Sequence, residues 1–335
     1  MEIKTVSMKD FSSLHVGGEG KAVEVLSIEE LKEALAYAKQ EDFRVHVLGQ
    51  GTNSYFGNNL SEFFFVKLNI KGITLEQGSQ TLDYRLQAFA SEIWDDVVAF
   101  AVERGLRGIE NLSYIPGTTG AAPVQNIGAY GAELANTFIS CEVFDTDEGI
   151  VKTITKEECQ FGYRDSIFKR EVGRYVILSV TLLLSEDRPF TLTYKPLDDL
   201  VDKDNVLLKD VRDKVIEVRR SKLPEWEVNP NCGSFFKNPV VSSEQGEVLR
   251  SRYPGMSLIS VGDGYKIPAA WLIEHIAEMK GVKIGSLRTW DKQPLVIVND
   301  GDATADGVDA FVGVIKRKIF DATGITLEQE VNRVG

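Results

Sequence analysis

The chain has 335 residues, and its 38 Lys and Arg against 50 Asp and Glu give a formal net charge of −12. Such a length supports roughly two domains of ~100–200 residues, which can bury a core without disulfide bonds. Because nucleic-acid binders neutralise many phosphates with Lys and Arg, an acidic chain with no basic cluster excludes nucleic acid as the expected partner. Any bound phosphate must then be held by backbone N–H groups and a few single cations.

Cysteine and histidine are scarce. The chain contains only Cys141, Cys159, Cys232, His15, His46 and His275. They form neither a disulfide framework nor a cluster at metal-ligand spacing, so we expect no metal site. Residues 1–4 lack the start of a signal peptide, and no stretch reaches the ~18 apolar residues of a membrane span. We therefore expect a soluble, cytoplasmic protein with no membrane partner, whose reactivity comes from a cofactor.

The first third of the chain alternates predicted strands and helices. Strands are expected at 22–26, 44–48, 63–68 and 72–76. Ser27, with Glu30 three residues later, forms a capping-box pattern that predicts a helix at 28–39. Ser91 is expected to cap a second helix, in which apolar residues from Trp94 to Ala101 recur at helical spacing. This alternation is typical of α/β lobes.

Residues 105–135 interrupt the alternation. They contain six glycines and two prolines and show little periodicity. Glycine-rich, weakly polar chain is suited to a close approach between backbone and ligand. The rest returns to mixed structure, and a charged, turn-rich stretch at 195–207 predicts a domain boundary. Further strands are expected at 142–145, 175–184, 190–194 and 294–299, and helices at 210–220, 269–279 and 305–320.

Residues 47–54 run from a strand into a glycine-rich turn that contains Gly49 and Gly51. Two glycines let the backbone N–H groups point one way and form a nest for an anion such as pyrophosphate. The spacing matches neither the G-x-G-x-x-G fingerprint nor the Walker motif. Because glycine so often marks turns, a plain turn is the alternative here.

Residues 115–131 form a second run, dense in Gly, Ala, Thr and Asn. Such a run exposes backbone donors and could wrap a large flat ligand. The alternative is a long Ω-loop, but long ordered loops in compact domains are usually functional. We favour a ligand-binding role.

Three other segments carry side chains suited to catalysis. Arg164 lies near aromatic residues and could bind a carboxylate bidentately, although an Arg beside an Asp is commonly a surface pair. Ser234 follows small residues and could donate a proton to a carbanion, although a structural turn explains it too, and no nucleophile-elbow context surrounds it. Glu328 and Glu330 share one face of an extended strand, either as an exposed acidic edge or with one of them as a buried acid.

Together, the order and spacing of these segments resemble the UDP-N-acetylenolpyruvoylglucosamine reductase family over nearly the whole chain. The resemblance implies an α+β fold with a two-lobed FAD-binding domain of the vanillyl-alcohol-oxidase type at 1–195, with lobes at about 1–68 and 69–195. A C-terminal α/β substrate-binding domain is then expected at 205–325, and a tail at 326–335 would carry Glu330 back to the active site. The implied activity is the NADPH-dependent reduction of UDP-N-acetylglucosamine enolpyruvate to UDP-N-acetylmuramate, a step of peptidoglycan precursor synthesis.

The resemblance also assigns residues to roles. The residues expected to bind FAD are Gly49, Gln50, Gly51, Thr52, Asn53, Ser54, Pro116, Gly117, Thr118, Gly120, Ala121, Gln125, Asn126, Gly128, Ala129, Tyr130 and Gly131. Those expected to bind substrate are Tyr163, Tyr194, Lys222, Gly233, Asn238 and Gln293. Tyr194 lies in an insert that resembles the first of the family's two types, in which a Tyr-bearing loop closes over the substrate. Besides NADPH and the nucleotide sugar we expect no partner, and we expect a monomer.

Arg164, Ser234 and Glu330 match the family's catalytic residues. Arg164 and Glu330 would stabilise the enolate-like species that forms after hydride transfer, and Ser234 would protonate its carbon. The choice of Glu330 over Glu328 rests on the resemblance. Two features depart from the family pattern. Residues 11–18 replace a more usual Asn-Thr-Phe opening, and the five residues after Glu330 leave little to anchor the tail.

Two other readings remain open. An FAD-dependent alcohol or sugar oxidase or dehydrogenase could use the same fold, although none of the three histidines lies in a loop suited to tethering FAD. A nucleotide-sugar binding protein without catalytic activity is the third reading, and the joint presence of Arg164, Ser234 and Glu330 counts against it.

Overall fold

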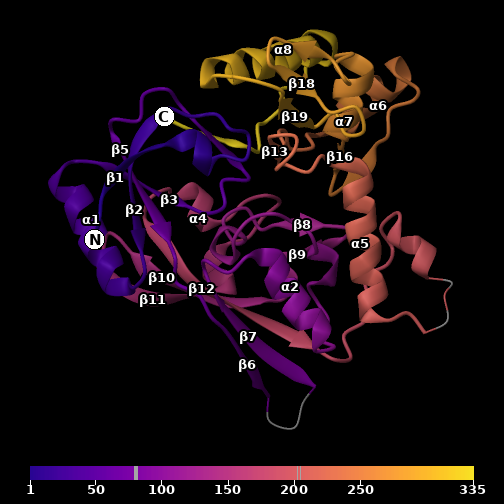
Figure 1. Ribbon diagram of the computed structural model, residues 1–335. Coiled ribbons are helices and arrows are strands. Elements are labelled where there is room, and N and C mark those ends of the chain that lie inside the picture. Colours follow the sequence, from indigo (N-terminus) through magenta and orange to yellow (C-terminus); the bar gives the residue numbers. More distant parts are fainter. Residues whose placement is uncertain (79–81, 202, 204) are drawn as a thin grey trace. The chain divides into compact units, whose positions relative to one another are not determined.

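The computed structural model describes residues 1–78, 82–201, 203 and 205–335, and they divide into two compact units (Figure 1). Unit 1 comprises Met1–Val6, Gly20–Gln50 and Ser61–Ser221, and unit 2 comprises Ser7–Glu19, Gly51–Leu60 and Lys222–Gly335. The domain limits expected from the sequence stay a prediction. Residues 202 and 204 of the expected boundary stretch lie outside the described residues.

The first sheet of unit 1 pairs its central strands in parallel, with one helix packed against it. Its strands, in spatial order, are β1 (Lys4–Ser7), β2 (Glu19–Val25), β5 (Phe63–Leu68) and β3 (Arg44–Leu48), and the helix is α1 (Ile28–Gln40). Ser27 caps α1 as expected, since its Oγ accepts the Glu30 N–H at 3.1 Å. The reciprocal half of the capping box was wrong: the Glu30 carboxylate accepts the Leu26 N–H, at 2.7 Å.

The second sheet of unit 1 has five strands, and neighbouring strands pair antiparallel. They are β11 (Ile150–Thr155), β10 (Phe138–Asp145), β12 (Tyr175–Ser185), β7 (Asp83–Phe89) and β6 (Ile73–Gln77), and the helix α2 (Trp94–Glu103) packs into the same core. The expectation that Ser91 caps α2 was wrong. The Ala90 and Glu92 carbonyls accept N–H groups of Gly120 and Thr119. The chain turns here, because the Glu92 N–H donates to the Phe89 carbonyl at 3.1 Å, and α2 begins only at Trp94.

The glycine-rich segment of unit 1 is irregular, as the sequence indicates. It holds only short elements: η2 (Glu110–Leu112), η3 (Thr119–Ala121), β8 (Gly128–Ala129), β9 (Ala132–Glu133) and η4 (Leu134–Asn136). Later in the unit come α3 (Lys156–Cys159), α4 (Ile167–Arg170), η5 (Leu197–Leu200) and α5 (Leu208–Lys222). The strand expected at 190–194 was wrong. Phe190 and Leu192 instead pack in a small core with Val211 and Val215 of α5.

Unit 2 contains three small sheets and several helices around a core of its own. The first sheet contains, in spatial order, β13 (Asn231–Ser234), β19 (Val296–Asn299), β18 (Leu287–Thr289) and β17 (Lys283–Ile284). The second contains β14 (Val240–Ser242), β16 (Gly264–Lys266) and β15 (Ile259–Val261). The third pairs β20 (Asn332–Val334) with β4 (Ser54–Phe56). The helical elements are η1 (Met8–Phe11), α6 (Ser243–Arg252), α7 (Ala269–Trp271), η6 (Leu272–Ile276) and α8 (Ala305–Thr323). The helix expected at 269–279 is therefore short and continues as the π-helical turn η6.

The tail after Glu330 is anchored, contrary to expectation. β20 pairs in parallel with β4, with Arg333 opposite Tyr55. The Asn332 N–H donates to the Asn53 carbonyl at 2.9 Å, and the Gly57 N–H donates to the Val334 carbonyl at 2.7 Å. Three paired residues and these hydrogen bonds therefore hold the tail to a strand from a distant part of the sequence. In the described part of the chain, no helix is both long and apolar enough to span a membrane.

Candidate functional site

Unit 1 contains a cavity of about 430 Å³ at the carboxyl ends of its parallel strands. Leu48 of β3, Leu68 of β5 and Glu24 of β2 reach its wall. In open α/β sheets, ligands characteristically bind outside the carboxyl ends of strands. Five of the residues expected to bind FAD line this cavity: Gly49, Gln50, Thr118, Gly120 and Ala121. The structure thus brings parts of the two glycine-rich segments to one cavity.

The structure explains why small residues line this cavity. A Cβ on Gly49 would lie 3.2 Å from Thr118 Oγ1 and 3.6 Å from the Ala121 Cβ, so it would fill space between two wall residues. A Cβ on Gly120 would lie only 2.6 Å from the Ala90 Cβ. Gln50 links the two segments, because its Oε1 accepts the Gly117 N–H at 2.8 Å.

The lining fits a nucleotide cofactor. It joins apolar residues to neutral hydrogen-bonding groups, including Ser91 and Asn69, and to the cations Lys67 and Lys71. Lys67 also lies 3.6 Å from Glu24. A cavity of several hundred Å³ with few placed polar groups is typical of cofactor sites. Among the described residues, no group of three or more His, Cys, Asp or Glu could hold a metal ion.

The rest of the first glycine-rich turn belongs to unit 2. A Cβ on Gly51 (φ 70°) would lie 1.9 Å from the Phe11 carbonyl oxygen, so the close approach of the two segments requires glycine. The Ser13 N–H donates to the Gly51 carbonyl at 3.0 Å, and the Ser12 hydroxyl donates to the Ser54 carbonyl at 2.9 Å. The altered N-terminal segment therefore packs on this turn.

Arg164 of unit 1 lies at the tip of a tight turn, in which Gly162 and Asp165 exchange backbone hydrogen bonds at 3.0 and 3.3 Å. Its φ of 54° is in the left-handed region, which is costly for a residue with a side chain. Arg164 Nη2 donates to the Gly128 carbonyl at 2.7 Å, and a Cβ on Gly128 would lie 3.0 Å from Arg164 Nη1. Gly128 thus admits the guanidinium to the backbone. The Asp165 carboxylate forms an ion pair with Arg170.

The remainder of the second glycine-rich run is tied to neighbouring loops. The Asn126 amide donates to Glu133 Oε2 at 2.9 Å and to the Gly162 carbonyl at 3.1 Å. The Asn111 amide donates to the carbonyls of Tyr130 and Thr191, both at 2.8 Å, and Asn111 is only 2 % exposed. These bonds join the run to the turn of Arg164 and to the insert that carries Tyr194.

The insert places Tyr194 beside the second run. The Tyr194 and Tyr130 rings form an edge-on contact, with centroids 6.1 Å apart. A Cβ on Gly131 would lie 3.7 Å from the Tyr194 Cβ. Tyr194 is 54 % exposed, and Tyr163 is exposed too, so both phenols can reach a ligand in solvent.

Ser234 and Glu330 of unit 2 lie on adjacent segments. Ser234 ends β13, opposite Val296 of β19, and the Glu330 N–H donates at 2.8 Å to the carbonyl of Phe235, which follows Ser234. Gly233 has φ 70°, so glycine suits the backbone that turns into Ser234. The structure therefore brings the serine and the tail glutamate together, although 96 positions separate them.

The structure distinguishes the two tail glutamates, which periodicity could not. The Glu328 side chain is 67 % exposed and forms an ion pair with Lys237. The Glu330 side chain is half-buried, and its carbonyl accepts the Asn53 amide at 3.3 Å. This supports Glu330 as the functional residue, since Glu328 is engaged at the surface.

The other expected substrate residues lie in unit 2. Lys222 is exposed and directly follows the last residue of unit 1. The Asn238 Oδ1 accepts the Ala269 N–H at 2.8 Å, at the start of α7. Gln293 Oε1 is one of three buried side-chain polar atoms that have no hydrogen-bond partner among the described residues, so it can accept from a ligand.

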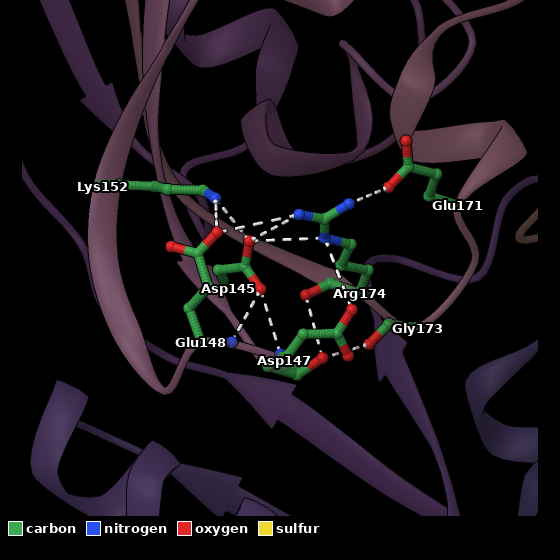
Figure 2. A network of polar contacts seen from close by, with 8 residues as sticks. Asp145, Asp147, Glu148, Lys152, Glu171, Gly173 and Arg174 are labelled. Carbon is green, nitrogen blue, oxygen red and sulfur yellow. Dashed lines mark hydrogen bonds and ion pairs between the residues drawn. The ribbon is translucent and has the colours of Figure 1, made fainter.

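A network of acidic and basic side chains surrounds Asp145 of unit 1 (Figure 2). Asp145 is fully buried and lies 2.5 Å from Lys152 Nζ and 3.3 Å from Arg174. Burial alone would raise the pKa of Asp145, but bonds from Lys152, from the Glu148 and Asp147 N–H groups and from Arg174 together lower it to about 2. Lys152 and Arg174 also lie over the ring of Tyr175, which lines the cavity.

Sequence reasoning missed several of these residues. Lys67 lies in β5, Asn69 and Lys71 follow that strand, and Tyr175 begins β12, so nothing local marks these residues as part of the cavity wall. Asn111 lies in the irregular stretch without a motif of its own. A prediction that β3 and β5 are parallel neighbours would have identified Lys67, because the carboxyl ends of parallel strands lie at the same edge of a sheet, where the cavity is.

Comparisons with known proteins agree along the chain. The FAD binding domain family matches residues 21–155, and the family of the UDP-N-acetylenolpyruvoylglucosamine reductase C-terminal domain matches residues 224–334. The UDP-N-acetylenolpyruvoylglucosamine reductase of Aliivibrio fischeri is 38 % identical over 328 residues, covering 97 % of this chain and 92 % of that protein. The protein of the same name from Flavobacterium johnsoniae is 35 % identical over 340 residues, covering 99 % of each.

The fold has a solved counterpart. The crystal structure of UDP-N-acetylenolpyruvylglucosamine reductase (MurB) from Thermus caldophilus matches with a TM-score of 0.69 and 23 % identity, covering 100 % of both chains. At this identity the likeness concerns the fold. The expected α+β class, with an FAD-binding domain and a distinct C-terminal domain, is confirmed.

Proposed function

The chain belongs to the UDP-N-acetylenolpyruvoylglucosamine reductase family, and from this premise we propose that it reduces the enolpyruvyl group of UDP-N-acetylglucosamine enolpyruvate to the lactyl ether of UDP-N-acetylmuramate. FAD is the bound cofactor and NADPH the electron donor. The observation that carries the proposal is the backbone pairing of residues 235–237 with residues 328–330, which places Glu330 next to the segment of Ser234. The family match over nearly the full length of the chain supports it independently.

The cofactor is held by the cavity of unit 1. Gly49, Gln50, Thr118, Gly120 and Ala121 line this cavity and would hold the cofactor, with Lys67 and Lys71 as the cations of the lining. Gly117, whose N–H donates to Gln50, would brace this site. When bound there, FAD would supply the hydride transfer from NADPH to the terminal carbon of the enolpyruvyl double bond.

The chain's own residues handle charge and proton. As hydride arrives, negative charge develops on the neighbouring carbon and its carboxylate. The Arg164 guanidinium and the Glu330 carboxyl group stabilise that charge by hydrogen bonding to it. The Ser234 hydroxyl gives its proton to the carbon. A group of high pKa suffices because the carbanion it meets is strongly basic.

Other side chains bind the nucleotide sugar and NADPH. Tyr194 and Lys222 bind the diphosphate, Lys222 supplying the single cation that an acidic chain needs there. The remaining substrate contacts are assigned to Tyr163, Gly233, Asn238 and Gln293. We place the enzyme in the cytoplasm as a monomer, serving peptidoglycan precursor synthesis.

Flavin absorbance tests this function directly. The purified protein should be yellow, lose its colour anaerobically with NADPH, and regain it on addition of the enolpyruvyl nucleotide sugar. Colourless protein that takes up no FAD would contradict the proposal. A flavin that an alcohol or sugar reduces, and NADPH does not, would make the chain an oxidase or dehydrogenase instead.

A further inference from the structure

The tail segment that carries Glu330 is held from one side by a buried tyrosine. The Gln329 amide donates to the Tyr55 hydroxyl at 3.3 Å and to the Val331 carbonyl at 2.8 Å. The Tyr55 hydroxyl in turn donates to Asp309 Oδ1 at 2.6 Å. Tyr55 belongs to β4 and is fully buried, and its hydroxyl forms hydrogen bonds with both Gln329 and Asp309.

The segment is extended, so its side chains alternate between two faces. Gln329 forms the bridge with Phe236, while Glu328 and Glu330 flank it and their backbones bond to Lys237 and Phe235. Leu327 and Val331 are buried, whereas Glu328 is exposed. Holding Gln329 on the Tyr55 face therefore fixes the face on which Glu330 is presented. A rotation of the segment would move both together.

Tyr55 also contacts the residues that follow Glu330. Arg333 lies opposite Tyr55 in the β20–β4 pairing, and Arg333 Nε lies 2.8 Å from Asp309 Oδ2. Asp309 therefore bridges the Tyr55 hydroxyl and the guanidinium of the tail. Burial, with Asp309 next, raises the pKa of Tyr55 far above its ordinary value, so the hydroxyl keeps its proton throughout the working pH range.

We infer that Tyr55 is a positioning residue for the reductase reaction: acting through Gln329 and Asp309, its hydroxyl sets the orientation in which the tail presents Glu330 to the substrate. The inference rests on the proposed function, since it takes Glu330 to act on the enolpyruvyl group. It assigns Tyr55 no contact with substrate or cofactor.

Two variants remove the same bond from opposite ends. Tyr55→Phe keeps the buried ring and deletes the hydroxyl, and Gln329→Met keeps the length of the side chain and deletes the amide. In each, reduction of the flavin by NADPH should stay within about twofold of the unchanged protein, while reoxidation by the enolpyruvyl substrate should slow by ~10- to 100-fold, as misplacement of a catalytic group predicts. Stopped-flow absorbance measures the two half-reactions separately.

The double variant tests whether one contact is responsible. Because both changes break the same bond, Tyr55→Phe with Gln329→Met should slow reoxidation about as much as the slower single variant. Glu328→Gln is the matched control: it removes a charge from the neighbouring residue of the same strand, on the exposed face, and should leave both half-reactions unchanged.

Three results would overturn the inference: single variants that reoxidise at the normal rate, equal slowing of both half-reactions, or multiplied effects in the double variant. Gln329 is half-buried, so Gln329→Met decides the matter if Tyr55→Phe does not fold. Failure of the proposed function looks different, because the unchanged protein itself would then not be reoxidised by the substrate.

Discussion

Ser234 needs no activating partner for the role proposed here. Neither a histidine nor a nucleophile-elbow motif marks it, and its backbone is set by β13 and the left-handed Gly233 before it. A hydroxyl of ordinary pKa is a poor nucleophile, but it can protonate a carbanion. What the residue requires is placement, and placement comes from the strand.

Ser234→Ala should therefore separate the two half-reactions. We expect NADPH to reduce the flavin at a near-normal rate, while reoxidation by the enolpyruvyl substrate falls by ~10²- to 10⁴-fold, the range of general-acid contributions. Stopped-flow absorbance at the flavin band is the measurement. Ser260→Ala, an exposed serine of β15, is the control. Equal loss of both half-reactions would refute the role of proton donor.

Asp145 is a second residue whose surroundings decide its chemistry. Its pKa of about 2 lies below the ordinary 3.8 because charge-assisted bonds outweigh burial. A carboxylate with a lowered folded-state pKa stabilises the protein above its unfolded pKa, and the stabilisation is lost as pH falls. Here it is complete above about pH 4 and disappears as the pH approaches 2.

Asp145→Asn should lower the free energy of unfolding by about 2 kcal/mol at pH 7, the equivalent of this pKa shift. Urea unfolding should show a constant difference from pH 5 to 8 and a smaller one toward pH 3. Asp147→Asn is the control, since the Asp147 side chain is 72 % exposed and pairs with the same Arg174; it should change stability by less than about 1 kcal/mol. A difference that grew on acidification would contradict the assignment.

At the scale of elements, Asn111 fastens two loops that no regular structure connects. Its amide satisfies the carbonyls of Tyr130 and Thr191, one in the second glycine-rich run and one in the insert of Tyr194. Buried carbonyls that lose their donors cost about 1–3 kcal/mol each. Asn111 therefore keeps Tyr194 beside Tyr130.

Asn111→Leu should lower the free energy of unfolding by about 1–3 kcal/mol, because the Tyr130 carbonyl loses its donor, whereas Thr191 is exposed and its carbonyl can bond to water. It should also raise the KM for the nucleotide sugar. Asn111→Asp places a carboxylate among carbonyl oxygens, which raises the folded-state pKa of the new carboxyl group. The free energy of unfolding of this variant therefore falls as the pH rises. Urea unfolding at pH 5 and 7 should show this dependence for Asn111→Asp and none of it for Asn111→Leu; identical pH profiles would count against the contacts.

Local patterns predicted most of these elements, because their causes are local. Short apolar segments placed β3 and β5, and the Ser27 cap placed α1; the predicted ends of α1, α5 and α8 lie within a few residues of the observed ones. Long-range bonds explain the failures. Ser91 does not cap α2, since Ala90 and Glu92 bond to residues near 120, and nothing near Glu330 foretells that β4 anchors the tail.

The site divides in the same way. Glycine-rich composition pointed to Gly49 and Thr118, but Lys67 and Tyr175 reach the cavity only because of how the strands are ordered. Likewise, residue types suggested Ser234 and a tail glutamate, while the choice between Glu328 and Glu330 needed the ion pair with Lys237.

At the scale of the whole molecule, the chain passes between the two units five times, after residues 6, 19, 50, 60 and 221. The core of unit 2 accordingly contains Leu14, Val16 and Tyr55 from the N-terminal third, together with residues beyond 231. No single cut separates the units into continuous pieces.

Residues 222–335 alone should therefore not fold. The fragment lacks three large core side chains, each worth about 2–5 kcal/mol, and a domain's total stability is only about 5–15 kcal/mol. It also leaves β20 without β4. We expect weak near-ultraviolet circular dichroism and no cooperative urea transition, against a cooperative transition in the full chain. A cooperative transition in the fragment would contradict the dependence.

The pairing of β20 with β4 has a consequence for biosynthesis. Tyr55 and Gln329 are 274 positions apart, so at ~5–20 residues per second a ribosome needs roughly 15–55 s to make the second after the first. During that time Tyr55 and Leu14 have emerged without the partners that bury them. Unit 2 can be completed only when the tail is made, and a chaperone that shields apolar segments on nascent chains would find its binding site at the early end of this protein.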